Sequence, residues 1–161
     1  MDSIDTNISD IYFIPEYHSE DFCNGTEVLI LIPSDIKDKE DLFQVYSEKL
    51  LLPGYFGKNW DALDECIGDL NWLNYKRIIL MHTDWPLYSD KNVYKTGETN
   101  KDIYIGVLSH AIAKNKANPD TNLSKEVIVF FPLEYKKEIN KIYRGKMHLL
   151  IPVYQDFYKK I

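Results

Sequence analysis

The sequence predicts an α/β protein in which helices pack on a small three-stranded parallel sheet. Three apolar runs carry this prediction: VLILIP (28–33), RIILMH (77–82) and EVIVFFP (126–132). Each run is apolar at consecutive positions, which is typical of strands that are buried on both faces of a sheet. Helical patterns lie between the runs, and strands that alternate with helices pair in parallel through crossover connections.

The helical patterns fill the intervals between the strands. Apolar residues recur at helical spacing within residues 34–52, 59–70 and 103–115. Candidate N-caps are Ser34 or Asp38 for the first helix and Asn59 for the second, because their side-chain oxygens can accept hydrogen bonds from free backbone N–H groups. The polar stretch 88–100 contains a glycine and is predicted to be a loop.

The chain is predicted to form a single domain over residues 1–161, because this length supports one ordinary core and is too short for two. The core spans about residues 26–132, and the segments 1–25 and 133–161 extend it at either end. In the first extension, IYFIP (11–15) has the composition of a short strand. The second extension has room for a helix and for the strand HLLIPV.

The composition narrows the class of protein. Hydrophobic residues make up 45% of the chain, and no run approaches the roughly 18 apolar residues that cross a membrane. The acidic start MDSIDTNISD lacks the features of a secretory signal, and the two cysteines have neither metal-site nor disulfide-framework spacing. We expect a cytoplasmic monomer without a metal, a cofactor or a membrane partner.

The charge is distributed unevenly. The net charge is −6, but residues 1–70 hold 16 acidic and 4 basic side chains, whereas residues 71–161 hold 9 and 15. An acidic surface repels phosphates, so the first half is not expected to bind nucleic acid. It suits a basic protein partner, whose approach it would accelerate. The alternative explanation of the net charge is that many soluble proteins are mildly acidic, without any role in binding a partner.

The predicted helix NWDALDECIGDL divides into two sides at 100° per residue. The apolar side holds Ala62, Leu63, Cys66, Ile67 and Leu70, with Trp60 near its edge. The opposite side holds Asp61, Asp64, Glu65, Asp69 and Gly68. Like charges four residues apart cost a few tenths of a kcal/mol (about 0.2–0.5 per pair). This side is therefore either a solvated helix face or a surface that receives a cationic partner.

The stretch LPGYFGKNWDALDECI (52–67) resembles the signature of the barstar family, whose members are small protein inhibitors of ribonucleases. The family pattern is met at Leu52, Pro53, Tyr55, Phe56, Gly57, Asn59, Asp61, Ala62, Leu63 and Glu65. The resemblance covers about residues 26–132 and implies a barstar-like fold. It also implies an intracellular immunity protein that inserts this helix and the loop before it into the active site of a ribonuclease toxin.

The resemblance implies a role for each matching residue. Glu65 occupies the central acidic position that enters the phosphate site of the nuclease, and Asp61 matches a second interface carboxylate one turn earlier. Tyr55 matches a loop aromatic that packs on a catalytic histidine, and Gly57 and Asn59 match positions at the rim of the interface. Carboxylates can take the place of phosphates in such a cleft, because ribonucleases hold RNA with cationic side chains.

The sequence departs from the family pattern at three positions. Lys58 stands where an acidic or neutral residue is usual, Asp64 stands where an aromatic is usual, and Glu65 replaces the commoner aspartate. Trp60 is the candidate to supply the aromatic side chain that the family usually has at the position of Asp64. The predicted partner-binding set is Tyr55, Gly57, Asn59, Trp60, Asp61, Asp64, Glu65 and Asp69.

Other readings of the same residues have less support. Two carboxylates on one helix face lack the pocket of a glycosidase acid–base pair. The four histidines show no metal-binding motif, His82 at the end of an apolar strand is expected to be structural, and Cys66 is expected in the core. We therefore predict a protein that is not an enzyme. The alternative function is a barstar-like regulatory module that binds some other basic protein.

Overall fold

The computed structural model describes residues 11–15, 22–24, 26–54, 56–117 and 125–142. Within these residues the strands are β1 (Ile11–Ile14), β2 (Phe22–Asn24), β3 (Glu27–Ile32), β4 (Arg77–His82) and β5 (Glu126–Pro132). The helices are α1 (Lys39–Lys49), α2 (Trp60–Asp69), α3 (Asn100–Ala117) and α4 (Lys136–Ile142), and the 3-10 turn η1 (Leu133–Tyr135) precedes α4. None of the helices in this part of the chain is long and apolar enough to cross a membrane.

The described strands form one sheet of five in the order β1-β5-β4-β3-β2. The strands β1, β5, β4 and β3 are parallel, and β2 pairs with β3 in the antiparallel direction. The predicted α/β class and the three central strands are confirmed, but the predicted number of three strands is wrong. One of the two additional strands, β1 with 4 residues, lies within the segment IYFIP (11–15) that was expected to form a short strand, whereas β2 has 3 residues and is too short to show a recognisable apolar pattern. The predicted strand HLLIPV lies outside the described residues.

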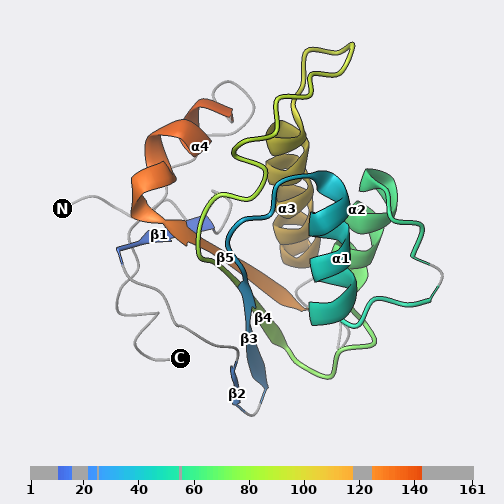
Figure 1. Ribbon diagram of the computed structural model, residues 1–161. Coiled ribbons are helices and arrows are strands. Elements are labelled where there is room, and N and C mark those ends of the chain that lie inside the picture. Colours follow the sequence, from blue (N-terminus) through green and yellow to red (C-terminus); the bar gives the residue numbers. More distant parts are fainter. Residues whose placement is uncertain (1–10, 16–21, 25, 55, 118–124, 143–161) are drawn as a thin grey trace.

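The helices α1, α2 and α3 lie on one face of the sheet (Figure 1). Each is anchored by apolar residues that join the main core, such as Tyr46 of α1, Ile67 of α2 and Leu108 of α3, all 0% exposed. A smaller buried cluster, which includes Ile79 and Phe130, occupies the opposite face of the sheet. Among the described helices, none contributes a residue to this second cluster.

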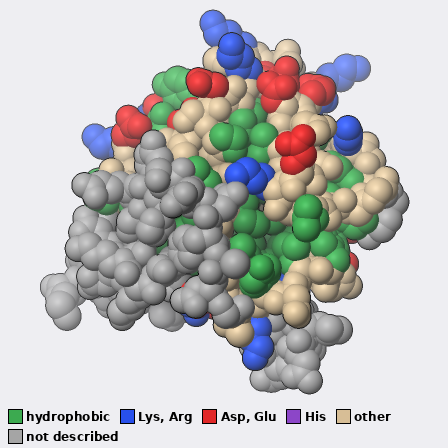
Figure 2. Space-filling view, turned by 60° about the horizontal axis from the view of Figure 1, so that its bottom comes forward, with side chains coloured by type: hydrophobic (Ala, Val, Ile, Leu, Met, Phe, Trp, Pro, Cys, Tyr) green, Lys and Arg blue, Asp and Glu red, His purple; other side chains and the backbone are tan. Residues whose placement is uncertain are grey.

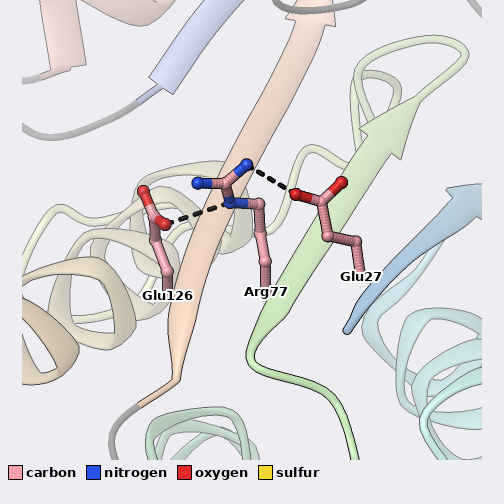
Figure 3. Close-up of polar contacts among 3 residues, drawn as sticks. All are labelled: Glu27, Arg77 and Glu126. Carbon is pink, nitrogen blue, oxygen red and sulfur yellow. Dashed lines mark hydrogen bonds and ion pairs between the residues drawn. The ribbon is translucent and has the colours of Figure 1, made fainter. Parts of the chain in front are cut away.

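A row of ion pairs joins the first residues of the three central strands (Figure 3). Arg77 Nη1 lies 2.7 Å from Glu27 Oε1, and Arg77 Nε lies 3.0 Å from Glu126 Oε2. These three residues are also partners in the strand register, so the guanidinium of β4 lies between the carboxylates of β3 and β5. The three side chains are partly exposed, and each pair therefore contributes at most about 1 kcal/mol to stability.

A chain of buried hydrogen bonds connects α1 and α3 to the sheet. The hydroxyls of Tyr46 and Tyr104 lie 2.5 Å apart, and the Tyr104 hydroxyl lies 2.6 Å from His82 Nε2. His82 Nδ1 lies 2.9 Å from the carbonyl oxygen of Phe130. Because a carbonyl can only accept, His82 Nδ1 carries the proton and donates it, while Nε2 accepts from Tyr104. His82 is therefore a structural histidine, as predicted.

We expect this histidine to make the protein sensitive to acid. Burial lowers the pKa of His82 from 6.5 to about 3, so the imidazole remains neutral in the folded state. Between those pH values the unfolded chain binds one more proton than the folded chain. The free energy of unfolding should therefore fall as the pH decreases below 6.5, by up to about 1.4 kcal/mol per pH unit from this group. Urea titrations monitored by tryptophan fluorescence from pH 7.5 to 4.5 would measure the slope.

Two variants isolate the contribution of His82. His82→Gln should show a smaller loss of stability per pH unit than the parent, although its stability at neutral pH is lower. Tyr46→Phe removes the outer hydroxyl and leaves the imidazole in place, so it should lower stability while it keeps the pH slope of the parent. Equal slopes for the parent and His82→Gln would contradict the assignment.

Candidate protein-binding face

The helix α2 begins with a side-chain cap. Asn59 Oδ1 accepts a hydrogen bond of 2.8 Å from the backbone N–H of Ala62, which confirms Asn59 as the N-cap. Asn59 Nδ2 also lies 3.4 Å from the carbonyl oxygen of Gly57. A Cβ on Gly57 would lie 3.1 Å from Asn59 Nδ2, so a larger residue there would press on the cap. The loop before α2 is thus held against the first turn of the helix.

The apolar side of α2 is fixed in the core. Leu63, Ile67 and Leu70 are 0% exposed, and Cys66 is 5% exposed. Burial, followed by the nearby charges of Glu65 and Asp69, raises the pKa of the Cys66 thiol. Cys66 is therefore a core residue, as predicted, and its position leaves it without the thiolate character of a nucleophile.

The opposite side of α2 carries a row of exposed carboxylates, which we call the acidic ridge: Asp61, Glu65 and Asp69. Successive members are four residues apart, so they are neighbours along one line of the helix. Among the described residues, no ion pair involves a member of the acidic ridge. The mutual repulsion of these carboxylates is therefore not relieved by a cation of the part of the chain that the structure describes.

Two further residues predicted on this side, Asp64 and Gly68, lie at its border with α3. Asp64 is half-buried and faces α3, where its Oδ1 lies 3.3 Å from Nδ1 of His110. Gly68 is buried, and a Cβ there would lie 3.1 Å from Cδ of Lys114 on α3. The placement of Gly68 on the exposed side was wrong, because the helical period gives two sides of α2 but does not show where α3 packs.

Trp60 holds the first turn of α2 in place. It is half-buried, its ring centroid lies 5.1 Å from that of Phe43 on α1, and its Nε1 donates a 3.1 Å hydrogen bond to Oδ1 of Asn100. Asn100 is 1% exposed, accepts a second hydrogen bond from the Tyr94 hydroxyl and donates one to Asp90. Asn100 was not identified from the sequence, because its connecting role depends on contacts between distant segments.

Two of the three residues that depart from the family pattern, Lys58 and Asp64, have partners within the chain. Lys58 adopts a left-handed backbone conformation with φ of 52°, and its Nζ lies 3.4 Å from Oε1 of Gln44 on α1. Asp64 is paired with His110, as described above. Tyr55 lies outside the described residues, so its predicted role stays a prediction.

Figure 2 shows one face of the molecule, on which hydrophobic side chains gather near the middle and both acidic and basic side chains lie mostly toward the upper edge.

A comparison with known families identifies the fold. Residues 26–115, more than half of the chain, match the family model described as Barstar (barnase inhibitor). The chain belongs to the barstar family. No individual curated protein matches it.

The barstar match includes β3, α1, α2 and β4 and ends within α3. The strand β5 lies beyond the match, yet it pairs in parallel with β4 in the described sheet. The resemblance predicted over residues 26–132 is therefore confirmed for its first 90 residues by the family model. The single-domain organisation, with its two terminal extensions, stays a prediction.

The contribution of the Asn59 cap to the free energy of unfolding should be measurable. Asn59→Ala removes the acceptor for the Ala62 N–H, so it should lower the free energy of unfolding by about 1 kcal/mol. Asn59→Asp keeps an acceptor oxygen at the same position and should remain close to the parent. Urea unfolding of the three proteins at pH 7.5 would check the prediction, and equal stability of the alanine and aspartate variants would refute it.

Proposed function

We propose that this barstar-family chain inhibits a ribonuclease toxin by covering its active site with the acidic ridge and the loop before α2. In this role it would act as an immunity protein. The observation that carries the proposal is the row of carboxylates without described cationic partners, Asp61, Glu65 and Asp69, on a capped helix of a chain in a family described as barnase inhibitors.

The chemistry of a ribonuclease cleft supports this role. Such a cleft needs cationic side chains to bind phosphates and to stabilise the transferring phosphoryl group. Residues four apart on a helix are separated by about 6 Å along its axis, so one cleft can contact two carboxylates of the acidic ridge. Charge-assisted hydrogen bonds from arginine or lysine would also relieve the repulsion within the ridge.

The scaffold supports an inhibitor that acts by binding alone. A rigid face loses little conformational entropy when it binds, and α2 is held by its cap, by Trp60 and by its apolar side. His82 and Cys66 are in the core, where they cannot reach a substrate. The proposal therefore assigns no catalytic step to this chain. It also places the chain in the cytoplasm as a monomer, where an inhibitor could protect the RNA of the cell that makes it.

Inhibition should depend on the acidic ridge. The ribonuclease encoded beside this gene would be assayed on a fluorogenic RNA with increasing inhibitor. Glu65→Gln and Asp61→Asn each remove a charge but little volume, and each should raise the inhibition constant roughly 10- to 100-fold, the value of one or two charge-assisted hydrogen bonds. Glu134→Gln, an exposed site on η1, removes the same charge outside α2 and should inhibit like the parent.

The outcomes distinguish the candidate functions. Inhibition that is indifferent to both ridge variants would contradict the proposal, as would ribonuclease activity of the chain itself. Binding to a basic protein without any effect on a nuclease would instead support the regulatory module.

The association rate should depend on salt. Opposite charges accelerate encounter, and the Debye length decreases from about 10 Å at 0.1 M salt to about 3 Å at 1 M. Stopped-flow tryptophan fluorescence should therefore show an association rate constant that falls steeply with added NaCl, while the dissociation rate constant changes less. The double variant Asp61→Asn/Glu65→Gln should show a shallower dependence. An association rate constant that does not respond to salt would exclude electrostatic steering.

A further inference from the structure

The face of the sheet that turns away from α1, α2 and α3 carries two rows of apolar side chains, and we call this apolar area the second face. Side chains alternate between the two faces of a strand, so register partners in neighbouring strands form rows across the sheet. The two rows run over β3, β4 and β5: Leu29, Ile79 and Ile128 form the first, and Leu31, Met81 and Phe130 form the second. Tyr12 and Ile14 extend the area onto the edge strand β1.

The Arg77 ion pairs mark one limit of the second face. Glu27, Arg77 and Glu126 precede the first apolar row by two residues in each strand, so they lie on the same face of the sheet (Figure 3). Their side chains are 26%, 33% and 48% exposed, respectively. The charged row is thus open to solvent, and whatever covers the second face lies over the part of the strands that follows this row.

The second face is buried more deeply than a bare sheet allows. Ile79, Met81 and Phe130 are 0% exposed. Side chains on one face stand side by side, roughly perpendicular to the sheet, so neighbours on the same face cannot cover their outer ends. Among the described residues, every hydrophobic side chain of this cluster belongs to β1, β3, β4 or β5. The layer over the second face is therefore to be sought in the rest of the same chain.

The remaining stretches of the chain differ in composition. Residues 1–10, 16–21 and 118–124 contain three, one and one hydrophobic residues other than proline, and the first two stretches contain three carboxylates each. Residues 143–161 contain ten such hydrophobic residues among 19, with a single acidic side chain. A cover for two apolar rows needs a comparable number of apolar side chains of its own, because buried polar groups without partners are costly. Among these four stretches, only 143–161 has such a composition.

The start of this stretch is anchored at the carboxyl end of the sheet. The strand β5 leads directly into η1 and α4 (Figure 1). The ring centroid of Tyr135 on η1 lies 6.0 Å from that of Trp85, and Ile139 of α4 is 0% exposed in the main core. The 19 residues after Ile142 span up to about 60 Å when extended and about 28 Å as a helix, whereas four strands are only about 14 Å wide. The stretch can therefore cross the second face in either conformation.

We infer that residues 143–161 form the layer that covers the second face, with the apolar run HLLIPV (148–153) packed on the rows that contain Ile79 and Met81. Contact between an apolar run and an apolar face removes both from water, which is the main driving force for such packing. The C-terminal extension is then part of the core of the domain rather than an appendage. The inference does not depend on the proposed function, because the second face lies on the opposite side of the sheet from α2.

The test uses the full chain, labelled with ¹³C at the methyl groups of isoleucine, leucine, valine and methionine. Nuclear Overhauser effects (NOEs) between methyl groups report distances of a few ångströms. They are expected between the methyl groups of Ile79 or Ile128 on the second face and those of Leu150 or Ile151. A second sample, mixed from labelled and unlabelled chains, separates contacts within one chain from contacts between two copies.

Each other pattern of NOEs overturns the inference. Contacts of Ile79 and Ile128 with Ile4, Ile8 or Leu123, in place of residues 143–161, would assign the cover to another stretch of the chain. Contacts seen only between labelled and unlabelled chains would assign it to a second copy. The absence of any such contact would leave residues 143–161 off the sheet.

Alanine variants measure the same cover through stability. Leu150→Ala and Ile151→Ala remove apolar atoms from the run, and at least one of them should lower the melting temperature by roughly 5 °C or more, as large-to-small changes in a core do. Ile8→Ala makes the same isoleucine-to-alanine change within residues 1–10 and should stay within about 2 °C of the parent. Melting temperatures of both run variants that equal that of the parent, or a greater loss for Ile8→Ala, would refute the inference.

Discussion

The packing of α2 against α3 determines how the barstar-family motif is displayed. The two helices are in close contact, and this contact buries Gly68, turns Asp64 toward His110 and joins Trp60 to Asn100. Three of the carboxylates remain exposed as a single row. A helix with the same sequence that packed against another neighbour would expose a different set of charges. The binding face is therefore a property of the helix pair rather than of α2 alone.

The scaffold supplies the stability that the acidic ridge removes. Like charges along α2 oppose helix formation by a few tenths of a kcal/mol per pair, whereas the Asn59 cap contributes about 1 kcal/mol and each buried aliphatic side chain contributes about 1.5–3 kcal/mol. Leu63, Ile67 and Leu70 are fully buried on the other side. A short helix can thus carry uncompensated charge because its core contacts outweigh the repulsion.

Much of this arrangement follows from sequence patterns, and the remainder depends on tertiary contacts. Continuous apolar runs located the three central strands, and the cap preference of asparagine located the start of α2. The edge strand β2 has 3 residues and no pattern to detect. Asn100 could not be singled out from the sequence, since its connecting role depends on contacts with Trp60, Tyr94 and Asp90 that only the fold brings together.

The three residues of the Arg77 ion pairs occupy equivalent positions in adjacent strands. Moving β3 or β5 by one residue relative to β4 would turn its glutamate to the other face of the sheet and break one of the two ion pairs of Arg77. The same slip would carry the apolar residues of that strand between the two hydrophobic clusters. The two ion pairs of Arg77 therefore favour the native register of the three central strands over a register shifted by one residue.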